Sequence, residues 1–210
     1  MKTATLVDAR APREKGVDEP GIGFMPTSVV MISCRSREGR ANIIPILAWS
    51  FACRWPPKIT IGICEGDYTP SYYRRASCHM IKDTGEFVIN FPDTSMRDKI
   101  TLTGDLTAND PSVDKFKAAG LTPGRSLVVK APTIEECPIS IECVVTEDLS
   151  LGSHHLFVGE IVAYHQLGDI VRHENREEVD EFLYEAAADR PRTLMSWCSL
   201  VQLRKADTEP

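Results

Sequence analysis

The chain has 210 residues, of which 42% are hydrophobic and 26% are charged, and its formal net charge is -6. This composition is ordinary for a soluble globular protein and excludes a chain that is disordered throughout. Binding a nucleic-acid backbone takes a concentrated basic surface, so the acidic balance gives no reason to expect nucleic acid as a partner. No apolar run approaches the roughly 20 residues that cross a bilayer, and we therefore expect no membrane segment.

The seven cysteines are scattered along the chain, and no two of them are spaced as a CxxC pair. An odd and scattered set predicts neither a disulfide framework nor a thiolate metal site, and we expect no bound metal. Reduced thiols in apolar strands suit a reducing compartment, and residues 1–16 contain no apolar leader. We therefore expect a cytoplasmic protein.

The predicted elements are mainly short strands. Apolar and β-branched runs are separated by Gly and Pro turns, and Ile59, Ile61 and Ile63 show the strict alternation of a half-buried strand. The predicted strands are residues 28–34, 42–50, 59–64, 86–90, 126–130, 139–146 and 154–165. The predicted helices are a segment carrying Arg74, Arg75 and Ser77, a short helix from Asp93 or Thr94 that Gly104 ends, residues 112–119 with Gly120 as the C′ residue, and an amphipathic helix at 174–189. Periodicity does not decide between strand and helix for residues 193–203.

This order of elements predicts a mainly β fold, a closed or partly closed antiparallel barrel with short peripheral helices. A parallel doubly wound sheet is disfavoured because strands and helices do not alternate regularly, and because the chain has no GxGxxG turn. We expect the domain to occupy residues 25–170, between an N-terminal extension at 1–24 and a C-terminal extension at 171–210.

The clearest functional signal lies between residues 42 and 90. Pro45 lacks an N–H and cannot belong to an uninterrupted central ladder, so the chain is predicted to bulge or to leave the sheet there, and a bulge would free neighbouring backbone groups. Arg74, Arg75 and Ser77 follow as a basic and hydroxyl cluster. A backbone-lined apolar slot beside such a cluster suits a planar ring joined to a phosphate. The alternatives are a kinked barrel strand filled by core side chains and an arginine pair that is only solvated.

Five short motifs occur along the chain in a fixed order. They are Asn42-Ile43-Ile44-Pro45 to Trp49, Pro56-Pro57, Gly85-Glu86-Phe87-Val88-Ile89-Asn90, Ala119-Gly120-Leu121, and the run from Gly152 to Ile161. Together they resemble the flavin reductase-like, flavoredoxin-type family over residues 25 to 170. The resemblance implies an FMN-binding split β-barrel that forms homodimers, with the flavin near the subunit interface and NADH or NADPH as electron donor. FAD stays open as the flavin.

The resemblance also implies the cofactor contacts. Main-chain N–H and C=O groups around Pro45 can match the donors and acceptors on an isoalloxazine edge. Arg75 and Ser77 match the family's phosphate-binding positions, and Arg74 is given the same role. The implied cofactor-binding residues are Asn42, Ile44, Pro45, Ile46, Leu47, Ala48, Trp49, Ser50, Arg74, Arg75 and Ser77.

His154 is the candidate catalytic residue, because it matches the histidine of a family strand that lies near the flavin and the nicotinamide. A structural histidine is the alternative, and strand alternation sends His155 to the opposite face. Three functions stay open. They are an NAD(P)H-dependent flavin reductase or related FMN oxidoreductase, a flavin-binding electron carrier with no productive nicotinamide site, and a non-redox barrel. For the first two, a redox protein is a possible partner.

Overall fold

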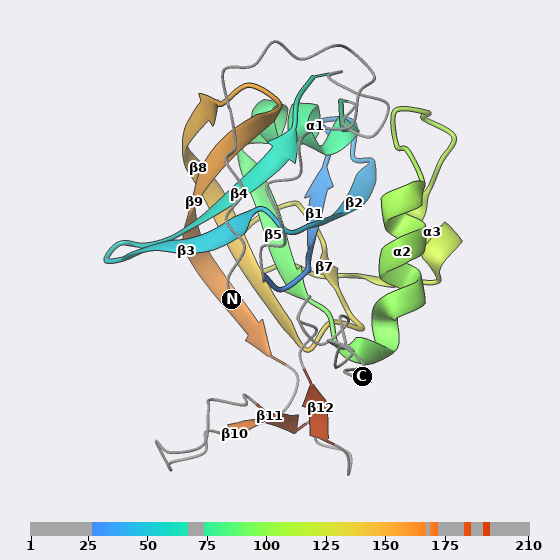
Figure 1. Ribbon diagram of the computed structural model, residues 1–210, viewed down its shortest axis with the longest axis vertical. Coiled ribbons are helices and arrows are strands. Elements are labelled where there is room, and N and C mark those ends of the chain that lie inside the picture. The colour runs from blue at the N-terminus through green and yellow to red at the C-terminus, as the bar shows by residue number, and fades with distance from the viewer. Residues whose placement is uncertain (1–26, 67–73, 167–168, 172–182, 186–190, 194–210) are drawn as a thin grey trace, which may run out of the picture.

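The computed structural model describes residues 27–66, 74–166, 169–171, 183–185 and 191–193. Within these residues, seven strands form one antiparallel sheet in the order β2-β1-β5-β8-β9-β4-β3 (Figure 1). The strands are β1 (Val30–Arg35), β2 (Ala41–Ile46), β3 (Trp49–Arg54), β4 (Pro57–Cys64), β5 (Glu86–Phe91), β8 (Ile139–Ser150) and β9 (His154–Gln166). The sheet curls into a barrel that is not closed, because β2 and β3 are its two edges. The expected mainly β, split-barrel fold is confirmed.

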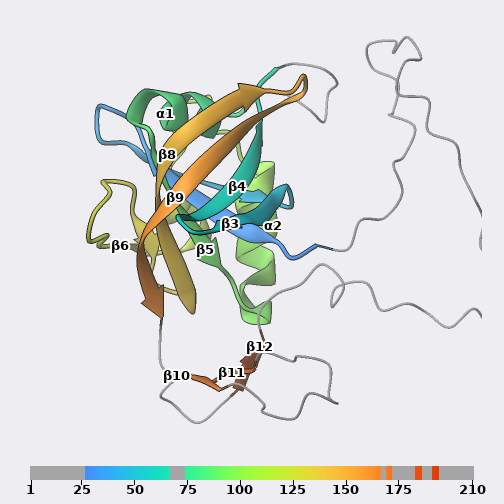
Figure 2. The same ribbon diagram turned by 90° about the vertical axis from the view of Figure 1, so that its left-hand side faces the viewer.

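Short helices and small sheets accompany the barrel. Helix α1 lies at one end of the barrel and α2 runs along one side (Figures 1 and 2). The helices are α1 (Ala76–Thr84), the 3-10 turn η1 (Thr94–Met96), α2 (Arg97–Asp105) and α3 (Lys115–Ala119). The small sheets pair β6 (Pro123–Gly124) with β7 (Thr133–Ile134), and join β10 (Asp169–Val171), β11 (Leu183–Glu185) and β12 (Pro191–Thr193). Among the described helices, none is both long and apolar enough to cross a bilayer.

Local signals explain where the helices begin and end. The Asp114 side chain accepts the Lys117 N–H at 3.0 Å at the start of α3, and Gly120 ends that helix with φ 57, as predicted. Gly104 does not end α2, which continues to Asp105. A Cβ on Gly104 would lie 3.3 Å from Pro45 Cγ, so this glycine serves the close approach of α2 to β2.

The core lies inside the curled sheet. Ile59, Ile61 and Ile63 on β4 are at most 2% exposed, which confirms the predicted buried face; on the opposite face Thr60 is partly exposed, but Gly62 and Cys64 are also buried. The three isoleucines pack with Phe87 and Phe157 in the main hydrophobic cluster. A second cluster joins β1 and β2 to the helices, and it includes Met31, Ile43, Met96, Phe116 and Leu121.

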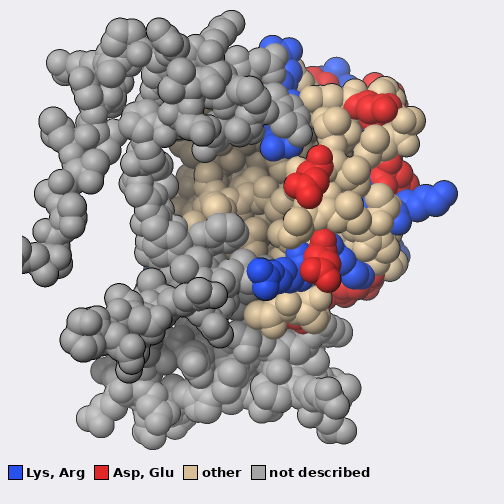
Figure 3. Space-filling model, turned by 45° about the vertical axis from the view of Figure 1, so that its right-hand side comes forward, with Lys and Arg blue, Asp and Glu red and all other residues tan. Residues whose placement is uncertain are grey.

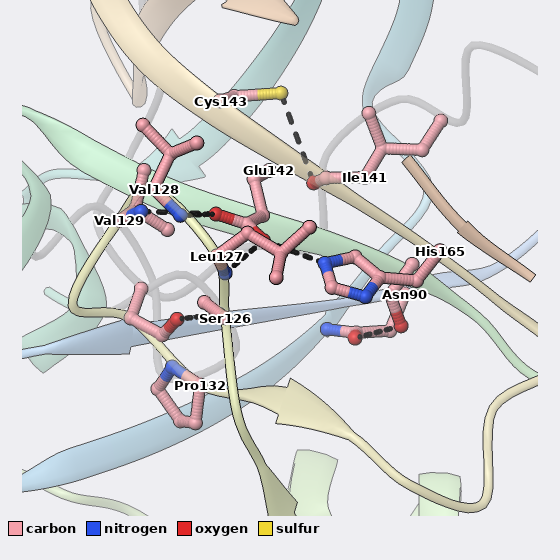
Figure 4. A network of polar contacts seen from close by, with 12 residues as sticks. Asn90, Ser126, Leu127, Val128, Val129, Pro132, Ile141, Glu142, Cys143 and His165 are labelled. Carbon is pink, nitrogen blue, oxygen red and sulfur yellow. Dashed lines mark hydrogen bonds and ion pairs between the residues drawn. The ribbon is translucent and has the colours of Figure 1, made fainter. Parts of the chain in front are cut away.

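A buried carboxylate holds a loop against the sheet (Figure 4). Glu142 on β8 is 0% exposed and accepts the N–H groups of Leu127, Val128 and Val129 at 2.6 to 2.9 Å, while His165 on β9 lies 2.5 Å away. Burial alone would raise the pKa of Glu142, but these backbone and histidine hydrogen bonds hold it below its ordinary value. The predicted strand at 126–130 is therefore wrong, because its N–H groups bond a side chain instead of a neighbouring strand.

Two other element predictions need correction. The predicted strand 42–50 is divided into β2 and β3, and the break falls at residues 47–48. Pro45 pairs with Met31 inside β2 without a register shift, so the predicted bulge at Pro45 is wrong. β2 is an edge strand, where a missing N–H is tolerated. The predicted helix 174–189 contains strand β11, whose pairing with β10 and β12 overrides the helical pattern, and its remaining residues lie outside the described ones.

Candidate functional site

The chain turns from β2 into β3 at Leu47 and Ala48, which are both exposed. The Leu47 carbonyl accepts hydrogen bonds from the Trp49 N–H at 3.0 Å and the Thr27 hydroxyl at 3.3 Å, and the Ala48 carbonyl accepts the Gly62 N–H at 2.7 Å. The N–H groups of Leu47 and Ala48 have no hydrogen-bond partner among the described residues. Two adjacent backbone donors are therefore available to acceptor atoms of a ligand.

Gly62 packs closely against this bend. A Cβ on Gly62 would lie 3.1 Å from Ala48 Cβ, which is tighter than ordinary contact, and 3.9 Å from His154 Cδ2, so Gly62, Ala48 and His154 lie close together. His154 is half-buried, and its Nδ1 lies 2.9 Å from the Ser153 hydroxyl. His155 is 4% exposed, in agreement with the predicted opposite face. The structure thus brings His154 to the segment in which ring contacts were expected.

Other residues of that segment serve the barrel itself. Ile44 and Ile46 are 7% and 8% exposed, and their side chains belong to the main core cluster. The Trp49 indole donates to the Ser28 carbonyl at 2.9 Å, and its ring packs edge-on against Phe91 with centroids 5.2 Å apart. Ser50 is exposed and donates to the Phe51 carbonyl at 3.1 Å.

Asn42 and Ser77 meet at the start of α1. The Asn42 side-chain amide donates to the Ser77 hydroxyl at 2.8 Å, and the two residues are 2% and 1% exposed. The other amide atom, Oδ1 of Asn42, is buried without a hydrogen-bond partner in the described part of the chain. A buried acceptor without a partner is costly, so the position favours a ligand group that donates a hydrogen bond.

Arg75 is the residue from which α1 starts. Its backbone N–H donates to the Cys64 carbonyl at 3.2 Å and its carbonyl accepts the Cys78 N–H at 3.0 Å, which ties the helix to the end of β4. The Arg75 side chain does not cap this helix end. The first N–H groups of a helix attract anions. Arg74 is exposed, and its Nε donates to the Glu65 carbonyl at 3.2 Å.

Lys115, a residue that the sequence did not single out, completes this cluster. It is 3% exposed, and its ammonium donates to the Thr103 carbonyl at 2.7 Å. Burial, and then repulsion from Arg75, lowers the pKa of Lys115 to about 8. Lysine is seldom this buried without a counter-ion, and its place in the first turn of α3 is the unfavourable end of a helix for a cation. A lysine in the first turn of a predicted helix is the sequence feature that could have identified Lys115.

The site residues fall into two groups. The bend at 47–48, Gly62 and His154 lie together and include two backbone donors, while Arg75 and Lys115 gather positive charge near the start of α1, the helix that contains Ser77. Figure 3 shows a hollow lined by uncharged side chains in the described part of the chain, with Lys or Arg side chains above it and charged side chains of both signs beside it. This arrangement fits a flat ring with an anionic tail, and the Asn42 Oδ1 atom fits a hydroxyl between the two.

Comparison with known proteins identifies the family. The flavin reductase-like domain model matches residues 22–182. An uncharacterized protein of Aquifex aeolicus is 30% identical over 65% of this chain and 67% of its own, and alignments with two other relatives span about half of those proteins. Nitrilotriacetate monooxygenase component B of Bacillus cereus has a TM-score of 0.65 at 22% identity, over 93% of this chain and 94% of its own. Flavoredoxin of Methanosarcina acetivorans has a TM-score of 0.63 at 22% identity, over 88% and 91%.

The structural likeness supports the split-barrel fold, and the domain match covers most of the chain, including every element that builds the site. The chain therefore belongs to the flavin reductase-like domain family.

Proposed function

We propose that this protein is an FMN-binding oxidoreductase of the flavin reductase type, which takes a hydride from NADH or NADPH and passes electrons through the flavin to an acceptor. The observation that carries the proposal is the buried cation of Lys115 beside Arg75 at the uncapped start of α1. A terminal phosphate would neutralise it, and FMN ends in such a group. FAD, which continues beyond its first phosphate, is the second choice.

The residues of this chain divide the work of holding the cofactor. Arg75, Ser77 and Lys115 would bind the phosphate, and Asn42 Oδ1 would accept a hydrogen bond from the ribityl chain. The N–H groups of Leu47 and Ala48 would meet the oxygen acceptors of the ring, and the missing side chain of Gly62 would admit the ring beside His154. Arg74 would add long-range attraction from the surface.

Bound flavin supplies a ring position that accepts a hydride directly from a nicotinamide, so the protein needs no obligatory acid or base. The task of His154 is then to orient the rings and to stabilise the charge that develops on reduction. Its half-buried position beside Gly62 and Ala48 suits that role.

Replacement of Gly62 by valine should crowd the bend at 47–48 and weaken ring binding. A Cβ at this position already lies 3.1 Å from Ala48 Cβ, and overpacking of this kind costs ~1–3 kcal/mol, so we expect riboflavin and FMN affinity to fall by about 5- to 150-fold if the strain falls on the ring site. Fluorescence titration measures both affinities. Thr60→Val, on the same face of β4, is the matched control, and equal affinities in the two variants would contradict the assignment.

Anaerobic mixing with pyridine nucleotides tests the reaction. The purified protein loaded with FMN should lose its absorbance near 450 nm on addition of NADH or NADPH. For an efficient enzyme, flavin reduction should proceed at a rate on the order of 1–1000 per second. A protein that dithionite bleaches but both nucleotides leave yellow would instead be an electron carrier. A protein that takes up neither FMN nor FAD would contradict both functions.

We also propose that the protein works as a cytoplasmic homodimer. The β3–β4 hairpin projects from the barrel (Figure 1) and carries Phe51 and Trp55, which are 58% and 88% exposed. Apolar side chains this exposed favour burial against a second copy. The six cysteines in the described residues are free thiols, which suits a reducing compartment. A monomer by light scattering that still binds flavin tightly would contradict the dimer.

A further inference from the structure

The loop that joins α2 to α3, residues 106–114, is fastened on two sides beside the proposed phosphate site. On one side the Arg40 guanidinium donates to the Ala108 carbonyl at 2.9 Å. On the other side the Asn109 side-chain amide donates to the Arg74 carbonyl at 2.8 Å. Figure 1 shows this α2–α3 loop at the end of the barrel where α1 lies. The flavin contacts proposed above use neither of these hydrogen bonds.

Further hydrogen bonds fix the course of the α2–α3 loop. The Asp110 carboxylate accepts the Ser112 N–H at 2.9 Å and the Ser112 hydroxyl at 2.7 Å. The Asp110 carbonyl accepts the Val113 N–H at 3.2 Å and the Arg40 guanidinium at 3.4 Å. The bonds from Ser112, and then the charge of Arg40, lower the pKa of Asp110, so its carboxylate is ionised at neutral pH. The loop therefore has a defined shape and carries a negative charge.

The α2–α3 loop leads directly into Lys115, the buried cation of the proposed phosphate site. The buried Cys34 thiol shows which groups lie around this point. Burial raises the pKa of Cys34 to about 12, while a hydrogen bond from the Ser77 hydroxyl and the charges of Lys115 and Arg40 oppose the rise. Lys115 is 3% exposed and Ala108 in the loop is 5% exposed. A group that binds the Lys115 ammonium is thus enclosed by protein, with the loop as one wall.

FMN and FAD differ in what they require of an enclosed phosphate site. The phosphate of FMN is a monoester, whose free oxygens carry a charge of about -1.5 to -2 at pH 7. In FAD one of these oxygens bridges to a second phosphate, which leads on to adenosine. FAD therefore needs an open path beyond its first phosphate, and that phosphate offers less charge to the surrounding cations.

We propose that the α2–α3 loop closes the phosphate end of the site and makes the protein selective for FMN over FAD, with Asn109 as the positioning residue that holds the loop closed. This inference rests on the proposed flavin function and deepens it, because that function leaves FAD as a second choice. The loop backbone occupies the path that the second phosphate of FAD requires. The Asp110 carboxylate adds repulsion, since like charges close together are unfavourable.

Fluorescence titration of the full chain with riboflavin, FMN and FAD tests the proposal. Wild-type protein should bind FMN at least about tenfold more tightly than FAD. Asn109→Ala removes the bond to the Arg74 carbonyl at an exposed position. It should lower the ratio of FMN to FAD affinity by about 2- to 10-fold, the value of one hydrogen bond, and leave riboflavin affinity unchanged. Unchanged riboflavin affinity separates an opened loop from a damaged fold.

A second variant and a matched control address the charge of the loop. The double variant Asn109→Ala/Asp110→Asn removes both the tie and the carboxylate charge, so its ratio of FMN to FAD affinity should fall further than that of Asn109→Ala. Asp105→Asn removes the same charge from the exposed end of α2, outside the loop. Its ratio should equal that of wild type.

Amide hydrogen exchange gives a direct reading of the α2–α3 loop. FMN should slow exchange in residues 106–114, whereas riboflavin, which has no phosphate, should not. Equal affinities of wild type for FMN and FAD, or a ratio that Asn109→Ala leaves unchanged, would overturn the role of the loop and leave the flavin function standing. A protein that binds none of the three flavins would overturn the proposed function and this role together.

Discussion

Replacing Lys115 by methionine should weaken FMN binding by about 10- to 150-fold at pH 7, the loss of a hydrogen bond to a charged group worth ~1.5–3 kcal/mol. Methionine retains most of the buried volume and removes the cation together with its hydrogen bond to the Thr103 carbonyl, neither of which touches the ring, so riboflavin affinity should change by no more than about twofold. The ratio of FMN to riboflavin affinity, measured by calorimetry, isolates the phosphate contribution. Arg75→Ala should lower the same ratio.

Lys117→Met is the matched control for this prediction. Lys117 lies on the same helix, α3, but is exposed. Its replacement should leave the ratio of FMN to riboflavin affinity unchanged. Equal losses of FMN and riboflavin affinity in Lys115→Met would contradict the phosphate assignment, because the variant would then act through the fold.

The same lysine makes the ratio depend on pH. The pKa of Lys115 is lowered to about 8, first by burial and then by Arg75. A phosphate binds the charged ammonium, so the FMN to riboflavin ratio should be highest below pH 8 and fall as pH rises above it. Lys115→Met should lack this fall.

Replacing Glu142 by leucine should destabilise the fold by about 3–5 kcal/mol, as expected when one partner of a buried charged network is removed. Three backbone N–H groups, those of Leu127, Val128 and Val129, would lose their acceptor, and His165 would lose its partner. Glu142→Gln keeps one acceptor oxygen and should cost less. Urea unfolding followed by circular dichroism measures the free energy of unfolding.

The control is Glu147→Gln on the same strand, where the side chain is 70% exposed and contacts only Lys58 in the described structure. That variant should lie within about 0.5 kcal/mol of wild type, as exposed ion pairs do. The pKa of Glu142 is lower in the folded protein than in the unfolded chain, so its contribution is present above pH ~4.3 and is lost as pH falls. Equal stability of Glu142→Leu and wild type would contradict the anchoring role.

Much of the fold follows from local sequence signals. Alternation at Ile59, Ile61 and Ile63 gives the correct buried face of β4, and Gly120 ends α3 as its position predicts. The wrong predictions of secondary structure lie where contacts between residues distant in the sequence determine the conformation. Residues 126–130 have the composition of a strand, but their N–H groups bond the buried Glu142, which lies in a later strand. Pro45 suggests an interruption of the strand, but β2 is an edge strand, where a residue without an N–H is tolerated.

Only part of the candidate site could be predicted from the sequence, again because distant contacts bring some of its residues together. Motif resemblance predicts cofactor roles for Arg75, Ser77 and His154, and the structure brings Ser77 to Asn42 and His154 to Gly62. Lys115 stands in a short helix far along the chain, and only the packing of α3 beside α2 and β2 carries it to Arg75. When a side chain of the site comes from an element far along the chain, as Lys115 does, the sequence around the other site residues gives no indication of it.

A crystal structure of the protein with FMN tests the central claim most directly. We predict phosphate oxygens at hydrogen-bonding distance, about 2.7–3.2 Å, from Lys115 Nζ, the Arg75 guanidinium and the Ser77 hydroxyl, with the ring against Gly62 between Ala48 and His154. Flavin bound at another face of the barrel, or a phosphate in solvent with Lys115 still bonded only to Thr103, would contradict the account.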